Sequence, residues 1–72
     1  MPVKNDATLE LTINQRAVLT NASLGYSYEE MAHLMDLSIN SVHWHSRECR
    51  VKLGALTITE AVAIAIRDGL IE

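Results

Sequence analysis

The chain has 72 residues, 49% of them hydrophobic and 21% charged, and its formal net charge at pH 7 is −3. A chain of this length forms at most one domain, buries roughly 60% of its unfolded surface and leaves little room for a large catalytic cleft. The composition excludes wholesale disorder, and no apolar run approaches the roughly 20 residues of a membrane-spanning helix. With no signal peptide and a single cysteine, we expect a soluble cytoplasmic protein without enzymatic activity.

Residues 1–9 have no periodic apolar pattern and contain Pro2 and an Asn-Asp pair. We interpret them as a flexible N-terminal arm before a domain of residues 10–72. The alternative, an arm that enters the minor groove of DNA, would favour arginines, and this segment has only Lys4.

The first helix is expected to begin at Thr12, which can form a capping box with Gln15, and to stop at Gly25. Leu11, just before the cap, is interpreted as a hydrophobic staple. The periodicity predicts a core-facing stripe made of Ile13, Ala17, Val18, Ala22 and Leu24.

The second helix is expected to begin with a capping box of Ser27 and Glu30. Its apolar residues recur at i, i+3 and i+4, which predicts a buried face made of Met31, Leu34 and Met35. Only Asp36 and Leu37 then separate it from the next cap, so the pattern predicts two helices joined by a tight turn, as in a helix-turn-helix.

The third helix is expected from about residue 38 to 53, with Ser38 as its N-cap and Gly54 as its stop. One stripe is expected to be buried, with His45 at its margin: Val42, Ser46, Cys49 and Leu53. The opposite side carries Asn40, His43, Trp44, Arg47 and Val51, flanked by Arg50. Three cations against one carboxylate make this the only net-positive element, and its outward side the best candidate for a binding surface.

Metal and cofactor chemistry is not expected. His43 and His45 diverge by about 200° on a helix and cannot share one metal ion. Cys49 has the helical position of a small buried residue; the alternative is a reactive thiol. No phosphate-binding glycine loop or nucleophile motif appears in the sequence.

The last helix is expected to begin at Thr57, paired with Glu60 in a third capping box, and to end near Gly69. Its core-facing residues are expected to be Ile58, Val62, Ala65 and Ile66. The outward side then carries Ala61, Ala63 and Ile64 together with Glu60, Arg67 and Asp68. We interpret this second apolar face as a dimer seam; the alternative is that small surface alanines have no partner.

Several sequence segments together resemble the LuxR/GerE family of bacterial helix-turn-helix DNA-binding domains. They are LTINQRAVL, GYSYEEMAHLMDLSINSVHWH, KLGA and EAVAIAIRDGLI, and they extend from Leu11 to Ile71. The resemblance implies an all-α, compact four-helix fold whose third helix enters the major groove and whose fourth helix forms a homodimer. It is closest to the stand-alone type without a sensor domain, so no small-molecule ligand is expected.

The resemblance also assigns roles to individual residues. Contacts with DNA phosphates are implied for Ser38, Ser41 and Lys52, and Arg50 is added because of its charge. Base-facing positions are implied for His43, Trp44, Ser46 and Arg47. The dimer interface is expected to contain Ala61, Ile64, Arg67 and Asp68. Residue chemistry agrees for Arg47, which can bind guanine in a bidentate manner, and for Trp44 or Val51, which can contact a thymine methyl group. Ser38 and Ser41 can equally act as capping residues.

Two functions remain open from the sequence. The first is a transcriptional regulator that binds double-stranded DNA as a homodimer. The second is a protein-interaction module that keeps the fold and modulates another LuxR-type regulator, with weak or no DNA binding. The second is favoured by the apolar residues Trp44 and Val51 and by the few surrounding cations, because exposed tryptophans often anchor protein interfaces.

Overall fold

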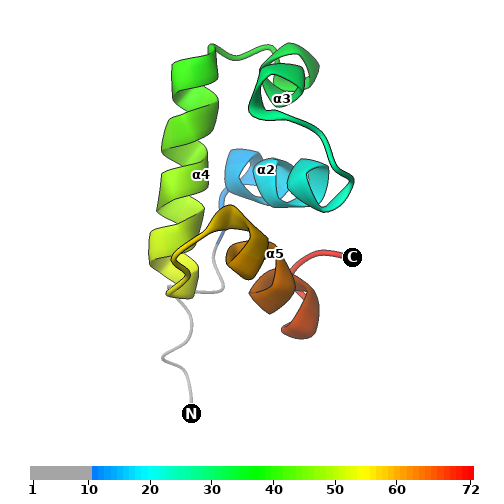
Figure 1. The fold of residues 1–72 in the computed structure, drawn as a ribbon, viewed down its shortest axis with the longest axis vertical. Helices are drawn as coiled ribbons and strands as arrows, with labels where there is room; N and C mark the ends of the chain where they lie inside the picture. Colours follow the sequence, from blue (N-terminus) through cyan, green and yellow to red (C-terminus); the bar gives the residue numbers. More distant parts are fainter. Residues whose placement is uncertain (1–10) are drawn as a thin grey trace.

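A computed structural model of the chain describes residues 11–72, which form four helices and no strand. The helices are α2 (Ile13–Ser23), α3 (Tyr28–Met35), α4 (Ile39–Leu53) and α5 (Ile58–Arg67) (Figure 1). The expected all-α, four-helix architecture is therefore confirmed. The expected N-terminal arm, residues 1–9, lies outside the described residues.

Each helix begins at the residue that its capping signal predicts. Thr12 and Ser27 both form complete capping boxes with the residue three positions later. Ser38 caps α4 by accepting a hydrogen bond from the amide of Ser41 at 3.1 Å. The third predicted box is only half formed: the Thr57 hydroxyl accepts from the Glu60 amide at 3.0 Å, as expected, but the Glu60 carboxylate accepts from Leu56 N instead.

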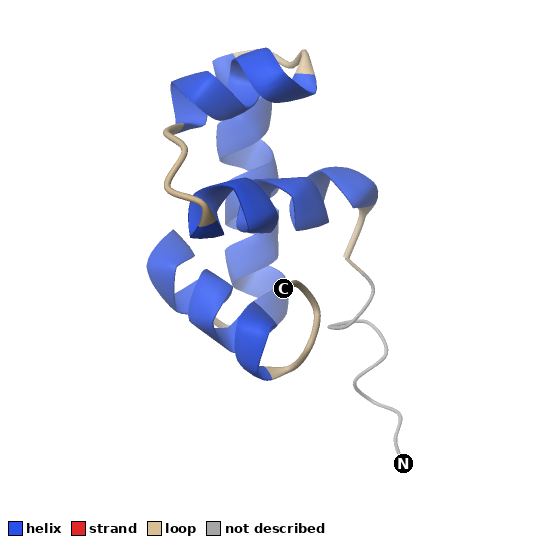
Figure 2. Cartoon of the chain, turned by 90° about the vertical axis from the view of Figure 1, so that its right-hand side faces the viewer, coloured by secondary structure: helices blue, strands red, loops and turns tan. Residues whose placement is uncertain are grey.

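α4 and α2 each contact all three other helices. α3 and α5 both pack on α4, and both also contact α2 (Figure 1). In the second view α4 lies behind the other three helices, which are gathered on one of its sides (Figure 2). One side of α4 is therefore covered by the domain and the other is left to solvent.

Two clusters of buried residues hold the helices together. The smaller lies between α2, α3 and α4 and contains Val18, Met31 and Val42. The larger joins α2, α4, α5 and the C-terminal segment, and its members are Leu11, Leu19, Cys49, Leu53, Ala61, Ala65 and Ile71. Ile58 packs against both clusters. The buried stripe predicted for α4 is confirmed in full, because Val42, Ser46, Cys49 and Leu53 are all buried.

The predicted core faces of the shorter helices are partly wrong. In α2, Ile13 is 87% exposed and Leu24 is also exposed, whereas Leu19 is fully buried. The helix is turned so that Val18 and Leu19 point inward and Gln15 is covered. In α3, Leu34 is exposed because the helix has only two turns and meets its neighbours on the side of Met31.

The core face of α5 agrees with the prediction in part. Ala65 is fully buried and Ile58 and Val62 pack against the core, as expected, whereas Ile66 is exposed. Ala61, expected on the outward side, is fully buried. Ala61 and Ala65 are four residues apart and lie on one line of the helix, within the cluster that joins α5 to α2 and α4. The core side of α5 thus includes Ala61, and Ile66 is left outside.

The turn between α3 and α4 contains only residues 36–38 and is stabilised by a backbone hydrogen bond. Asp36 adopts the left-handed conformation, with φ 55° and ψ 47°, and the Leu37 amide donates to the Ala32 carbonyl at 2.9 Å. Gly54 ends α4 in the same way, with φ 69°. None of the described helices combines the length and apolar character needed to cross a membrane.

Candidate nucleic-acid interface

The solvent-facing side of α4 carries the predicted binding residues. Asn40, His43, Trp44, Arg47 and Val51 are all exposed. Four of them, Asn40, Trp44, Arg47 and Val51, follow each other at i, i+4, i+7 and i+11, so they form one line along the helix. We call this line the outward line of α4. It alternates hydrogen-bonding and apolar side chains. Asn40 was noted on this side of the helix but was not among the expected base-facing residues.

His43 lies beside the outward line, and its side chain packs against α3. Its ring packs edge-to-face on Tyr28, with centroids 4.6 Å apart and an interplanar angle of 81°. The Tyr28 hydroxyl is hydrogen-bonded to the Ser46 hydroxyl at 2.6 Å. Tyr28 thus links α3 to α4 and limits where the imidazole can move. No role was expected for Tyr28, although its position three residues before Met31 places it on the buried side of α3.

The expected base-facing role of Ser46 is wrong for this fold. Ser46 is only 1% exposed, and its hydroxyl is bonded to Tyr28 inside the α3–α4 contact. It belongs to the buried stripe that periodicity predicts, and the position carried over from the family resemblance conflicts with that periodicity. The side chain holds the two helices together and does not reach the surface.

Trp44 is 56% exposed, and its indole ring packs against the imidazole ring of His45. The two rings meet edge-to-face, with centroids 5.2 Å apart and an interplanar angle of 72°. His45 is half-buried, and its Nε2 lies 3.4 Å from Nδ2 of Asn14 in α2. If the amide donates this bond, Nε2 accepts and the ring proton lies on Nδ1. The Trp44 indole therefore packs on the His45 ring, which lies within hydrogen-bond distance of Asn14 in α2.

The three cations of α4 have different surroundings. Arg47 is exposed on the outward line, whereas Arg50 is half-buried, and its Nε is a buried atom with no hydrogen-bond partner among the described residues. Lys52 is also half-buried, and its Nζ donates to Gln15 Oε1 at 2.9 Å. The same oxygen accepts from the Thr12 amide at 3.0 Å. Lys52, expected to contact phosphate, thus ties the last turn of α4 to the cap of α2.

Ser38 and Ser41 occupy the first turn of α4 and bond to each other. The Ser38 hydroxyl donates to the Ser41 hydroxyl at 3.0 Å while it accepts from the Ser41 amide. Ser38 thus caps α4, whereas Ser41 supplies the capped amide and its hydroxyl bonds, among the described residues, only to Ser38. Since the N-terminus of a helix carries a partial positive charge, the same turn also suits an anion such as a DNA phosphate.

The expected dimer residues do not form one exposed set. Ala61 is fully buried, so its assignment to a dimer interface is wrong: the small side chain is used inside the core. Ile64 is half-buried and packs against the larger cluster. Arg67 and Asp68 are exposed and form an ion pair with each other at 3.1 Å. The exposed apolar residues of α5 are Ala63 and Ile66.

Cys49 has the environment of a core residue, as expected. Its Sγ donates to the Gln15 carbonyl at 3.3 Å, and burial raises the pKa of the thiol to about 11, against opposing effects of Lys52 and Arg50. A thiol with this pKa is protonated at neutral pH and unreactive. Within residues 11–72, no group of three or more His, Cys, Asp and Glu residues is arranged to hold a metal ion.

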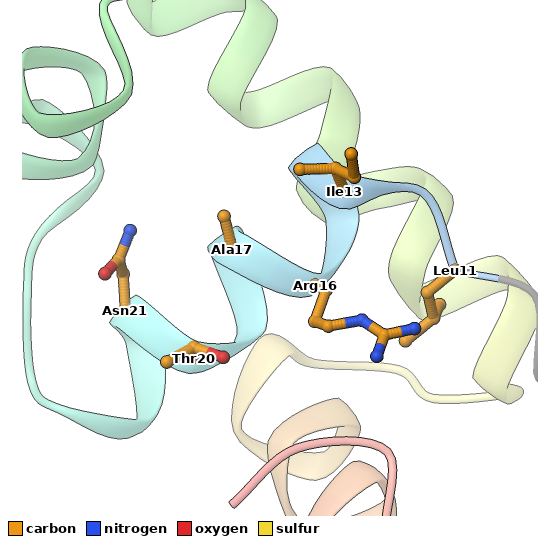
Figure 3. Close-up of a pocket in the computed structure, with 6 residues that line it drawn as sticks. All are labelled: Leu11, Ile13, Arg16, Ala17, Thr20 and Asn21. Carbon is orange, nitrogen blue, oxygen red and sulfur yellow. The ribbon is translucent and has the colours of Figure 1, made fainter.

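One surface hollow lacks converging chemical groups. It is an open depression of about 540 Å³ that runs along α2 and is lined by a single stretch of chain (Figure 3). Its residues are Leu11, Ile13, Arg16, Ala17, Thr20 and Asn21. One arginine among apolar and amide or hydroxyl side chains offers no acid–base pair or nucleophile. The outward line of α4 is the more distinctive surface.

Comparison of the chain with protein-family models, curated proteins and solved structures gave no match. The assignment of function therefore depends on the residues and geometry described above, together with the sequence resemblance.

Proposed function

We propose that this chain is a sequence-specific regulator of transcription that binds double-stranded DNA through α4, as a helix-turn-helix domain of the LuxR/GerE type. The observation that carries the proposal is the uncovered side of the longest helix, with Asn40, Trp44, Arg47 and Val51 in one line. A helix about 10–12 Å wide fits the major groove, which is about 12 Å wide. The three-residue turn after α3 holds this helix at the edge of the domain.

The charge distribution supports the same surface. The whole chain is acidic, with nine carboxylates against six lysines and arginines. Its cations are concentrated on α4, where Arg47, Arg50 and Lys52 outnumber Glu48. Because DNA meets one face of a protein and not its average charge, the excess of acidic residues elsewhere favours an approach that presents α4.

The decisive experiment is selection of bound duplexes from a random-sequence DNA pool by the purified chain, at low and near-physiological salt. We expect enrichment of one motif, and we expect Arg47→Ala to weaken binding to it by about 1–3 kcal/mol, because a bidentate contact with guanine is lost. Arg16→Ala is the matched control, since Arg16 is also an exposed helical arginine but lies on α2. A folded protein that enriches no sequence contradicts the proposal.

We further propose that the regulator acts as a homodimer through the exposed side of α5, with Ala63, Ile66 and Arg67 as the contact residues. Ile66→Glu is the variant of choice, because its side chain is exposed, whereas Ile64 contributes to the core. We expect Ile66→Glu to shift the sedimentation coefficient to that of a monomer while the helical circular dichroism is retained. A motif without two-fold symmetry and an unchanged sedimentation coefficient would contradict dimerisation.

The alternative function is a protein-interaction module that modulates another LuxR-type regulator. The exposure of Val51, at 70%, and of Trp44 is the observation that favours it. Under this alternative, Trp44→Ala abolishes binding to the partner regulator, whereas Arg47→Ala has little effect, and the random DNA pool shows no enrichment.

A further inference from the structure

We propose that Trp44 and Val51 are specificity-determining residues, and that they select thymine methyl groups on the two sides of the base read by Arg47. The inference rests on the proposed function of α4 as a DNA-reading helix and adds the chemistry of the target sequence. It predicts a binding site in which a guanine is flanked by thymines, on either strand, within about two base pairs.

The spacing of Trp44, Arg47 and Val51 along α4 supports this assignment. Trp44, Arg47 and Val51 are separated by three and four residues, so they project from the same side of the helix on successive turns. At a rise of about 1.5 Å per residue, Trp44 lies about 4.5 Å before Arg47 and Val51 about 6 Å after it. Base pairs are stacked about 3.4 Å apart. The Trp44 and Val51 side chains therefore lie on opposite sides of the Arg47 guanidinium, each at a distance of one to two base pairs along the DNA.

The exposure of Trp44 and Val51 also supports this assignment. Trp44 is 56% exposed and Val51 is 70% exposed, although α4 as a whole is strongly polar outside its buried stripe. In the major groove the only apolar group that a base presents is the C5 methyl group of thymine. An apolar side chain beside a guanine-reading arginine therefore has one complementary partner on DNA.

The contact between the Trp44 and His45 rings also supports this assignment. The Trp44 ring meets the ring of His45, which is half-buried and lies within hydrogen-bond distance of Asn14 in α2. Val51 is β-branched, so its χ1 angle is strongly restricted in a helix. Both groups are thus preorganised, and little conformational entropy is lost when they meet a methyl group.

The test uses duplexes with the motif enriched from the random pool, in which one thymine at a time is replaced by uracil. This change removes a single methyl group and leaves base pairing intact. We expect about fourfold weaker binding at the flanking thymines, which corresponds to the roughly 0.8 kcal/mol of one buried CH₂ group. Replacements outside the flanks should leave the dissociation constant unchanged.

Variants assign each methyl group to a side chain by double-mutant cycles. In Val51→Ala the fourfold loss should vanish at one flank and persist at the other, and Trp44→Ala should do the reverse. Ile13→Ala serves as the control, because it removes an exposed isoleucine from α2 and should retain both losses.

The outcomes separate the inference from the proposed function. If an Arg47-dependent motif is found but uracil is tolerated at every position, the inference is overturned and the proposed function stands. If the pool yields no motif and Trp44→Ala instead abolishes binding to another regulator, the inference and the DNA-binding function are both overturned, and the outward line is a protein interface.

Discussion

At the scale of single residues, the hydrogen bond between Tyr28 and Ser46 is a polar contact that joins α4 to α3 beside their apolar cluster. Both hydroxyls are at least half-buried, and the Tyr28 ring also supports His43 on the candidate DNA-binding side. A polar pair in this place fixes an angle between two helices, which apolar packing alone would specify less sharply. The bond therefore connects the core to the binding surface.

We expect Ser46→Ala to lower the free energy of unfolding by about 1–2 kcal/mol, because the Tyr28 hydroxyl is left without its partner. Tyr28→Phe tests the other half of the bond. In the double variant the loss should be smaller than the sum of the single losses, and urea denaturation of the four proteins measures the difference. Strict additivity would show that the bond contributes nothing to stability.

Cys49 gives the domain a specific response to alkaline pH. Burial raises the pKa of its thiol from the ordinary value of 9.0 to about 11. The folded state therefore retains this proton at pH values where the unfolded chain has lost it. The contribution to stability is complete below about pH 9 and is lost as the pH rises through 11, by up to about 2 kcal/mol.

Denaturation curves between pH 8 and 11 measure this effect. Cys49→Ala is the comparison, because it removes the thiol while the tyrosines and lysines still titrate. We expect the difference in stability between wild type and variant to shrink as the pH rises. A difference that stays constant over this range would mean that the thiolate forms as easily in the folded domain as in the unfolded chain.

At the scale of elements, the ends of α3 and α4 are both set by a left-handed residue, but of different types. Gly54 tolerates φ 69° without strain, whereas Asp36 has a side chain at φ 55°. The αL conformation costs most non-glycine residues roughly 1–2 kcal/mol. Because Asp adopts this conformation more readily than most residues, the tight turn that positions α4 is made with less strain than another side chain would cause.

Substitutions at these two ends should act in opposite directions. Gly54→Ala is expected to lower the free energy of unfolding by about 1 kcal/mol through the backbone alone, since an added Cβ meets no heavy atom within 4 Å. Asp36→Gly is expected to raise it by about 0.5 kcal/mol, because relief of strain exceeds the added freedom of the unfolded chain. Thermal or urea denaturation measures both, and a neutral Gly54→Ala contradicts the αL end of α4.

At the scale of the whole molecule, the domain presents few cations on an acidic background. With Arg47 assigned to a base contact, two cations on α4, Arg50 and Lys52, are available for phosphates, and Lys52 is also bonded to Gln15. Binding should thus depend less on released counterions, and more on base contacts, than for strongly basic DNA-binding domains. Specificity is then expected to be high relative to affinity.

The salt dependence of DNA affinity tests this expectation. Each neutralised phosphate contributes about −0.9 to the slope of log K against log salt concentration. We expect a slope no steeper than about −3 for each chain bound to the selected motif, and a shallower slope for Arg50→Gln. A titration that gives a much steeper slope would require additional phosphate contacts from elsewhere in the chain.

The sequence alone determined where each helix begins and ends, because caps and stops are local. Ser27 and Glu30, or Ser38 and Ser41, meet within a single turn, and Gly54 needs no distant partner to adopt its conformation. The sequence also determined both sides of α4, since 15 residues contain a buried stripe and an exposed one with little ambiguity.

Only the tertiary structure decided which face of the shorter helices enters the core. Ile13, Leu34 and Ile66 are apolar and suitably spaced but exposed, while Ala61 is buried. A helix of two or three turns has too few residues to define one apolar side, and its rotation is set by the space its neighbours leave. The same geometry removed Ala61 from the dimer interface, because long-range packing gave it partners inside the domain.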